Sequence, residues 1–418
     1  MSGTNRRIVL AALGPGYLVA VGYMDPGNWA VDIGAGADSG YRLLVVVLIA
    51  SFAAAFLQGL AVRLALATGR DLATLIRIHF PKAAVVALWL AAELAMVATD
   101  LAELVGSGVA FKLLFGWDLI VGTLIAAVAS IIILALPSRT GRTPQWIVAA
   151  LALTVAVCLA LELVLVRPDG AAVAAGLRPS LDIVGDPTML YLSLGIVGAT
   201  IMPHNLYLHT GLAGQRAATL AVERTRALRL LTADSWFALT LAFLVNAAIL
   251  ILAGTVFYDA PAGTSAGIET AYRLLGSPLG PTLAGVLFAV ALLAAGQSAT
   301  TTGTMAGQMV IEGFLGHRLP RWVRGFITRS AALVPAVAVF VYYGERSVDT
   351  LLIVSQIVLS LALPLVLFPL LLLLENRPLM GALAPGPISR GLAWFLTVAL
   401  TGLNLWLLII AVQPAGLS

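Results

Sequence analysis

Two long apolar runs of this chain are interrupted by tetrapeptides of the same pattern. The first interruption is residues 25–28 (DPGN) and the second is residues 202–205 (MPHN), with proline second and asparagine fourth in both. A lipid bilayer contains no water to pair with a freed backbone group, so broken membrane helices persist only where they line a cavity enclosed by protein. Two breaks in corresponding positions of two halves predict the binding site of a transporter, near the middle of the bilayer.

The composition places the rest of the chain in a membrane as well. Of the 418 residues, 60% are hydrophobic and 11% are charged, whereas about 25% of a soluble domain is charged. Apolar runs recur up to the end of the sequence, so we expect no soluble domain of useful size. The net charge of +4 does not indicate nucleic-acid binding, because the basic residues fall in loops between the runs. The single cysteine, Cys158, excludes an intramolecular disulfide.

Eleven apolar runs are candidates for membrane spans, since crossing the bilayer takes about 20 helical residues. They cover residues 8–37, 43–68, 84–112, 117–136, 146–166, 189–212, 234–257, 281–315, 326–343, 348–374 and 389–412. The opening residues lead directly into the first run without a signal-type cleavage site, so no removable targeting segment is expected. With a cytoplasmic N-terminus, 16 Lys and Arg residues fall in inside loops and 6 in outside loops. The excess of inside charge predicts a plasma-membrane protein with its N-terminus cytoplasmic and its C-terminus outside.

The spacing of the breaks predicts an inverted repeat. The breaks fall in the first and sixth spans, and an odd number of crossings between them turns the second unit upside down relative to the first. We therefore predict an all-α polytopic membrane protein with two units of five spans, residues 1–168 and 169–378. Residues 379–418 would add an eleventh span, and the first and sixth spans would be discontinuous helices.

The first break carries a hard, charged ligand. Asp25 lies near the middle of its span, where an unpaired charge costs at least about 2.5 kcal/mol, so an acid there is a functional residue by default. A structural ion pair is the alternative, but the first span contains no basic residue to form one. Asn28 follows one turn later. Pro26 and Gly27 free nearby carbonyl oxygens, which are good cation ligands in an unwound segment.

The second break carries a soft ligand in the equivalent position. A lone methionine in an apolar helix is usually core filler, but Met202 stands where the other break has its acid. A thioether has little affinity for Mg²⁺ or Ca²⁺ and binds softer ions. One carboxylate, two amides and a thioether therefore predict a site for Mn²⁺ or Fe²⁺, with Co²⁺, Zn²⁺ or Cd²⁺ as competitors.

At this point the chain resembles the Nramp family of proton-coupled divalent metal transporters. Five motifs, in order along the chain, carry the resemblance: GYMDPGNWAVDI (22–33), AAELAMVATDLAE (91–103), GATIMPHNLYLHT (198–210), GTMAGQMVIEGFLG (303–316) and SQIVLSLALP (355–364). The resemblance implies a leucine-transporter-like fold, entry of metal from outside, and uptake driven by proton symport with alternating access. It implies Mn²⁺ or Fe²⁺ and a proton as substrates, Cd²⁺ and Co²⁺ as further cargo, and no permanently bound cofactor.

The resemblance also implies a set of metal ligands. The matching side chains are Asp25, Asn28 and Met202, and the matching backbone carbonyls are those of Gly22 and Ala199. Gln356 matches a glutamine that approaches the metal in some conformations of the family. Val31 and Thr210 depart from residues frequent in the family, but neither is a ligand position.

The third span offers a proton route. Glu93, Asp100 and Glu103 are separated by seven and three residues, which leaves all three within roughly 80° on one helix face. Acids on a membrane helix line water or pair with cations. The ninth span provides Arg324 and Arg329, of which we prefer the deeper Arg329 as partner. The resemblance supports Asp100 and Glu103 as proton-path residues, and a purely structural salt bridge is the main alternative for Glu93.

Two histidines and two amides complete the candidate residues. His204 adjoins the second break and His209 follows five residues later; histidine titrates near physiological pH, which suits a proton relay. For His209 a hydrogen-bonded packing role is equally expected. Gln58 and Asn246 are buried amides that are expected to support the site by bonding the unwound backbone. In this scheme a metal ion displaces the proton of Asp25, which leaves through His204 or the acids of the third span.

Three other classes of protein fit the sequence less well. An amino-acid or Na⁺-coupled transporter on the same fold would place small residues and hydroxyls at the breaks, because an acid repels a substrate carboxylate. An intramembrane enzyme would need a motif such as the metalloprotease signature HExxH, which is absent. A metal-sensing receptor would need a soluble output domain. Nothing in the sequence demands more than a monomer, and no nucleic-acid partner is expected.

Overall fold

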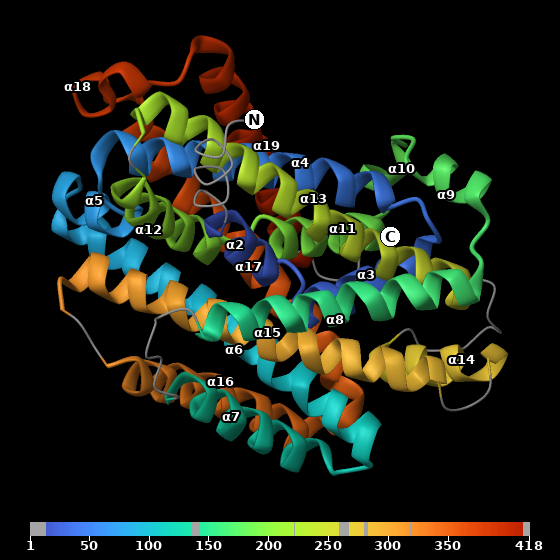
Figure 1. Ribbon diagram of the computed structural model, residues 1–418. Coiled ribbons are helices and arrows are strands. Elements are labelled where there is room, and N and C mark those ends of the chain that lie inside the picture. The colour runs from blue at the N-terminus through green and yellow to red at the C-terminus, as the bar shows by residue number, and fades with distance from the viewer. Residues whose placement is uncertain are drawn as a thin grey trace, which may run out of the picture.

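The computed structural model describes residues 14–135, 143–220, 222–258, 267–279, 283–317 and 320–412, and all regular structure within these ranges is helical (Figure 1). The helices in the predicted spans are α2 (Pro15–Gly22), α3 (Pro26–Ser39), α4 (Leu44–Thr68), α6 (Lys82–Phe115), α7 (Leu119–Ala135), α8 (Thr143–Val166), α11 (Pro187–Thr200), α12 (Pro203–Thr219), α13 (Arg224–Phe257), α15 (Leu283–Leu315), α16 (Arg321–Tyr343), α17 (Val348–Glu375) and α19 (Pro387–Val412). Shorter elements join them: α5 (Leu72–His79), α9 (Gly170–Gly176), α10 (Asp182–Gly185), α14 (Ile268–Leu279), η1 (Glu345–Ser347), α18 (Arg377–Met380) and η2 (Gly381–Leu383).

Among the described residues, nine helices are long and apolar enough to cross a membrane, with α11 and α12 counted as one. The other two predicted spans are α7, which has 17 residues, and the pair α2 and α3. The predicted start of that first span, residues 8–13, lies outside the described residues. An integral, multi-pass membrane protein is therefore confirmed, whereas the count of eleven spans stays a prediction.

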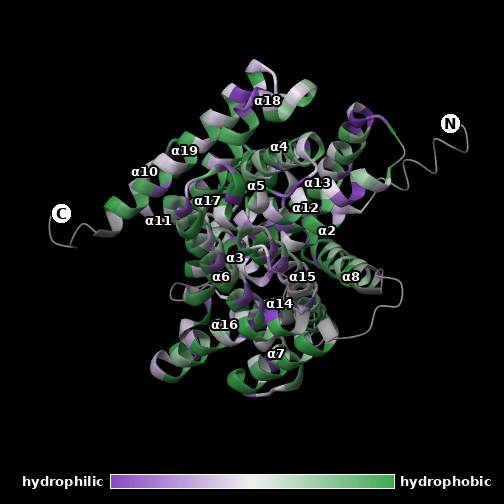
Figure 2. Cartoon of the chain, turned by 90° about the vertical axis from the view of Figure 1, so that its left-hand side faces the viewer, coloured by the Kyte–Doolittle hydropathy of each residue, from purple (hydrophilic) through white to green (hydrophobic). Residues whose placement is uncertain are grey.

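The outward faces of the peripheral helices fit lipid. On α8, Leu153, Val157, Leu161 and Val164 are all exposed and recur about every four residues, so they form one stripe along the helix. Figure 2 shows apolar colour along α7 and α8. Contiguous exposed apolar surface of this kind would drive aggregation in water and is stable against hydrocarbon.

Several helix bounds differ from the predicted spans. α13 starts at Arg224, ten residues before the predicted span, because the polar segment before the apolar run is helical as well. The short helices α5, α9, α10, α14 and α18 lie in segments where loops are predicted. Residues 1–13 and 413–418 lie outside the described residues. The orientation of the termini and the repeat boundaries at residues 168 and 378 stay predictions.

The two broken spans lie at the centre of the bundle. α3 packs against α6, α11, α13 and α17, and α12 packs against α4 and α15. Both breaks start a new helix with proline at its first position, Pro26 in α3 and Pro203 in α12. Proline is favoured there, because the N–H that it lacks would have no partner within the helix. The sequence thus places each break, and the surrounding helices shield its open backbone from lipid.

Candidate metal site at the two broken helices

The first break contains one carboxyl oxygen and one amide oxygen that are buried without a partner among the described residues. Asp25 is the N-cap of α3, and its Oδ1 accepts a hydrogen bond of 3.0 Å from the Asn28 backbone N–H. Asn28 Nδ2 donates to the carbonyl of Tyr23. Asp25 Oδ2 and Asn28 Oδ1 are both buried and have no hydrogen-bond partner among the described residues. Buried polar atoms without partners are rare. These two oxygens are candidate ligands for a cation.

The second break has a similar arrangement built around sulfur. Met202 is the residue before α12 and is fully buried. Asn205 Nδ2 donates to the Met202 sulfur at 3.4 Å. Asn205 Oδ1 is buried, and in the part of the chain that the structure describes it has no hydrogen-bond partner. The second break therefore offers a thioether and an amide oxygen.

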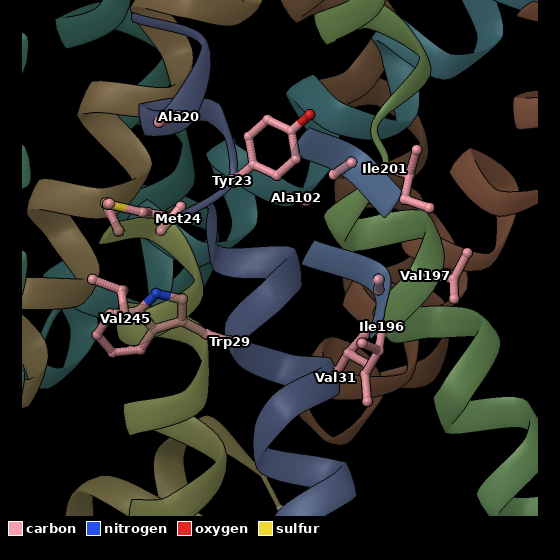
Figure 3. Close-up of a cluster of buried hydrophobic side chains, with 14 of the residues drawn as sticks. Ala20, Tyr23, Met24, Trp29, Val31, Ala102, Ile196, Val197, Ile201 and Val245 are labelled. Atoms are coloured by element: carbon pink, nitrogen blue, oxygen red, sulfur yellow. The ribbon is translucent and has the colours of Figure 1, made fainter. Parts of the chain in front are cut away.

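The two breaks lie side by side and run in opposite directions. A Cβ added at Gly22 would lie 2.9 Å from Asn205 Nδ2, and one added at Gly195 would lie 3.0 Å from Val31 Cγ1. Gly22 is three residues before Asp25, and Asn205 is three residues after Met202. This antiparallel register brings Asp25 opposite Met202. In Figure 3, Val31 of α3 lies next to Ile196 of α11, which agrees with this register.

The predicted carbonyl ligands lie at the C-terminal ends of the two leading half-helices. Gly22 is the last residue of α2, and Ala199 is the last but one of α11. The last four carbonyls of a helix have no partner within it, and that end carries a partial negative charge. Both positions are buried, so these two helix ends favour a cation between them.

Gln356 reaches the first break from α17. A Cβ added at Gly27 would overlap the Gln356 amide group and would lie 3.2 Å from Asp25 Oδ2. Gln356 is fully buried, and its Oε1 has no hydrogen-bond partner in the described ranges. The glutamine therefore lies against the break, beside the free oxygen of the acid. Glycine at position 27 is what allows this close approach.

α6 touches both breaks. His204 Nδ1 lies 3.3 Å from the Thr99 hydroxyl, and a Cβ added at Gly106 would overlap the ring of Pro26. Asp100 and Glu103 lie between these two contacts along α6 and are buried. They face α15, where a Cβ added at Gly303 would be 3.0 Å from Glu103 Oε1 and 3.7 Å from Asp100 Oδ1. The two buried acids therefore lie on the stretch of α6 between its contacts with the two breaks.

The two arginines of α16 have different acids as neighbours. Arg329 Nη1 lies 3.9 Å from Asp100 Oδ2, while its Nε donates to the Ser130 hydroxyl at 2.6 Å. Arg324 Nη2 forms a salt bridge of 2.7 Å with Glu93 Oε2, and Glu93 Oε1 also accepts from the Trp89 indole at 3.1 Å. Both carboxylate oxygens of Glu93 are thus engaged, whereas the contact of Asp100 with Arg329 is longer than a hydrogen bond.

His209 and Gln58 form a relay of hydrogen bonds that ends at the first break. His209 Nδ1 lies 2.8 Å from Gln58 Oε1 and its Nε2 lies 3.3 Å from the Ser235 hydroxyl. Gln58 Nε2 donates to the Tyr23 hydroxyl at 2.8 Å. The expectation that Gln58 bonds unwound backbone is therefore wrong, because its amide bonds the side chains of Tyr23 and His209 instead. Asn246 Oδ1 is buried without a hydrogen bond to the described residues.

Two buried acids with oxygens that lack a described partner were not among the residues expected from the sequence. Asp32 is seven residues after Asp25 on α3, is 3% exposed, and its Oδ2 lacks a partner among the residues described. Glu162 lies within α8, and both of its carboxylate oxygens are buried without described partners. The rule applied to Asp25, that an acid inside an apolar run needs a reason, would have found both. Asp32 also satisfies the seven-residue spacing that selected Asp100 after Glu93.

No group of three or more histidine, cysteine or acidic side chains among the described residues could hold a metal ion. The site at the breaks differs in kind from such clusters. It offers one carboxylate together with amide, carbonyl and thioether donors. Carboxylate, carbonyl and amide oxygens suit Mn²⁺, and the sulfur adds affinity for softer ions.

Membrane helices broken in pairs around a buried polar site define a class, the transporters that bind their substrate near the middle of the bilayer. The chain is similar to a manganese transporter of Eremococcus coleocola, solved in complex with an aromatic bis-isothiourea substituted compound. The TM-score is 0.87 and the identity 34%, with 97% of this chain and 87% of that chain covered. MhsT in complex with L-phenylalanine shares the fold, with a TM-score of 0.59, 14% identity, and 96% and 97% covered. The leucine-transporter-like fold is confirmed, and the protein is a transporter rather than an enzyme.

Sequence comparisons give the family. The family described as Natural resistance-associated macrophage protein-like, or Nramp, matches residues 16–410. The divalent metal cation transporter MntH of Xanthomonas campestris pv. campestris is 48% identical over 96% of this chain and 90% of its own length. The MntH of Nostoc sp. is 45% identical over 96% and 91%. The chain belongs to the Nramp family.

Proposed function

We propose that this protein imports divalent transition metal ions across the plasma membrane by proton symport. Mn²⁺ and Fe²⁺ are the proposed main substrates, and Cd²⁺ and Co²⁺ are further ones. The observation that supports the proposal is the antiparallel register of the breaks, in which a buried acid, Asp25, and a buried methionine, Met202, occupy corresponding positions. The names of the relatives agree, since they are divalent metal cation transporters and a manganese transporter.

The choice of ion follows from the donors. Asp25 Oδ2 and Asn28 Oδ1 are hard oxygen donors from the first break, with the carbonyls of Gly22 and Ala199 at the adjoining helix ends. Ca²⁺ and Mg²⁺ prefer oxygen ligands alone, so a thioether at Met202 disfavours them relative to Mn²⁺, Fe²⁺ and Cd²⁺. Gln356 lies beside Asp25 and supplies a further amide when the ion is bound.

The proton route is proposed to run along α6. Asp25 accepts either a proton or a metal ion, so metal binding releases its proton. The released proton has two buried acids within reach, Glu103 and Asp100, and Arg329 lies 3.9 Å from Asp100 as their counter-charge. His204 joins the second break to α6 through Thr99. We propose Glu93 and Arg324 as a structural pair beside this route, and His209, Gln58 and Asn246 as its supports.

Alternating access is proposed to come from rocking of the two broken spans against the remaining helices. The proposed units are residues 1–168 and 169–378, related by inversion, with residues 379–418 as an added span. A cytoplasmic N-terminus and an outside C-terminus complete the proposal, and one chain contains the entire set of donors, so a monomer suffices.

Proteoliposomes that contain a pH-sensitive dye test the proposal. With Mn²⁺ outside, the wild-type protein is expected to take up the ion and to acidify the lumen. Asp25→Asn keeps the shape of the side chain, removes its charge, and is expected to abolish both signals. Asp38→Asn is the matched control, because Asp38 is an exposed acid on the same helix.

Each other outcome has a definite meaning. Full Mn²⁺ transport by the Asp25→Asn variant would reject the proposed site. Uptake without acidification would reject symport and retain metal transport. Uptake of a labelled amino acid with Na⁺, in place of Mn²⁺, would favour the rival transporter on the same fold.

A further inference from the structure

Asn205 occupies the place in the second break that Asn28 occupies in the first, but it makes a different hydrogen bond. Asn28 Nδ2 donates to the carbonyl of Tyr23. Asn205 Nδ2 donates to the Met202 sulfur at 3.4 Å, in a fully buried setting. The amide of the second break is therefore directed at a proposed metal ligand.

A methionine needs such a partner if its sulfur is to bind an ion. The side chain is unbranched and has three rotatable bonds, so the thioether can face several directions. Sulfur is a weak hydrogen-bond acceptor, and it carries two lone pairs. An N–H donated to one lone pair restricts the rotamer of Met202 and leaves the other lone pair for the ion.

Asn205 also packs against the half-helix that leads into the first break. A Cβ added at Gly22 would lie 2.9 Å from Asn205 Nδ2 and 3.1 Å from Oδ1, so the amide group packs directly on the Gly22 backbone. Gly22 lies opposite Asn205 in the antiparallel register, and its carbonyl is a proposed ligand. Asn205 therefore contacts both the Met202 sulfur of the second break and the Gly22 backbone that precedes the first break.

We propose that Asn205 is a positioning residue that aims the Met202 sulfur at the transported ion and thereby sets the preference of the site for soft ions. The inference rests on the proposed function, because it presupposes that the breaks bind a metal ion. It concerns binding selectivity, so it can fail while the proposed function stands.

Calorimetric titration of the purified full-length protein with Cd²⁺ and with Mn²⁺ tests the inference. Leucine is close to asparagine in shape and has no amide, so the variants are Asn205→Leu, Met202→Ala and the pair combined. Asn205→Leu is expected to weaken Cd²⁺ binding about tenfold, or about 1.4 kcal/mol, and Mn²⁺ binding about threefold. In the Met202→Ala background the same change is expected to weaken Cd²⁺ binding by less than about twofold, because no sulfur remains to be aimed.

Two further variants keep the result interpretable. Asn404→Leu removes a buried amide that bonds Ser360 between α17 and α19, and it is expected to leave the ratio of Cd²⁺ to Mn²⁺ affinity unchanged. Asn205→Ser is smaller, removes the reach to sulfur and guards against poor folding of the leucine variant. Thermal unfolding and gel filtration are recorded for all of them.

The outcomes separate the inference from the proposed function. An equal loss of affinity for both ions, or a loss that simply adds to that of Met202→Ala, would overturn the positioning role. An unchanged ion preference in Asn205→Leu, alongside a clear change in Met202→Ala, would overturn it as well. A wild-type protein that binds neither ion, or an Asp25→Asn variant that binds both normally, would instead reject the proposed function.

Discussion

The two breaks share a backbone design and differ in chemistry. In both, proline is the first residue of a new helix and the residue before it is the N-cap. In the first break the Asp25 side chain caps its helix by accepting the Asn28 N–H. In the second, the Met202 side chain makes no capping bond to a described residue. Proline thus sets where each helix breaks, while the residue before proline differs in the side chain that it offers, a carboxylate in one break and a thioether in the other.

Making the first break resemble the second is expected to have the largest effect. Asp25→Met removes the only negative charge at either tetrapeptide, so Mn²⁺ affinity should fall at least about a hundredfold, or about 2.7 kcal/mol. The variant also loses the α3 cap, which costs about 1 kcal/mol of stability. Calorimetric titration with Mn²⁺ measures the affinity. An affinity within threefold of wild type would show that the Asp25 carboxylate is not a main ligand of Mn²⁺.

Making the second break resemble the first should change selectivity more than affinity. Met202→Asp supplies a second carboxylate and removes the thioether that precedes Pro203. Ca²⁺ takes several oxygen ligands and no sulfur, so we expect Ca²⁺ to compete with Mn²⁺ at about tenfold lower concentration than in wild type. Competition of Ca²⁺ against radioactive Mn²⁺ measures this. A variant that still excludes Ca²⁺ would remove the thioether from the account of selectivity.

The third position of the tetrapeptide separates the breaks again, since it is Gly27 in one and His204 in the other. A Cβ at Gly27 would overlap the Gln356 amide, so Gly27→Ala should displace that side chain at a cost of about 1–3 kcal/mol in stability. We expect Mn²⁺ transport to fall about threefold to tenfold, and Gln356→Ala in the same chain to restore the stability by making room. Uptake rates and thermal unfolding are measured together.

Gly214→Ala is the matched control for that substitution. Gly214 lies on α12, and no described atom would come within 4 Å of a Cβ added there. Its stability and transport should match wild type or improve slightly, because alanine favours a helix more than glycine does. Equal losses in both variants would trace the effect to helix propensity rather than to Gln356.

The position of the breaks and the buried polar residues at them could be predicted from the sequence because they are exceptions to the membrane pattern. Proline, glycine and an acid inside an apolar run each conflict with a plain lipid-facing helix. The same reasoning, applied to every acid, would have added Asp32 and Glu162. What the sequence could not supply is the partner of each long side chain.

Partners depend on how each helix is rotated and on which neighbour it meets. Arg324 and Arg329 are both plausible on spacing, yet one pairs with Glu93 and the other faces Asp100. Gln58 was expected at unwound backbone and bonds the Tyr23 hydroxyl instead. Ser130, which accepts from Arg329, lies on α7, far away in the sequence. These contacts arise between helices, and periodicity describes only one helix at a time.

The smallest effect on Mn²⁺ affinity is expected from a cluster of partly exposed ion pairs away from the breaks. At the end of α6, Lys112 Nζ lies 2.9 Å from Glu269 Oε2 of α14 and 2.7 Å from Glu345 Oε2 of η1, and Arg273 also pairs with Glu269. Partial burial raises the pKa of Glu269, but the hydrogen bonds from Lys112 and Arg273 outweigh it and hold the pKa below its ordinary value. Salt bridges this exposed contribute at most about 1 kcal/mol.

Glu269→Gln should therefore leave Mn²⁺ affinity unchanged and affect stability only through pH. A carboxylate whose pKa is lowered by folding stabilises the protein above its unfolded pKa of about 4.3, and this contribution is lost as the pH falls through the folded value. The wild-type protein should thus melt slightly above the variant at pH 6, and the difference should disappear as the pH falls through the lowered folded pKa of Glu269. Thermal unfolding in detergent across this range measures it. A large loss of Mn²⁺ affinity in this variant would mean that solvent-exposed charges act on the ion as strongly as the buried carboxylate of the first break.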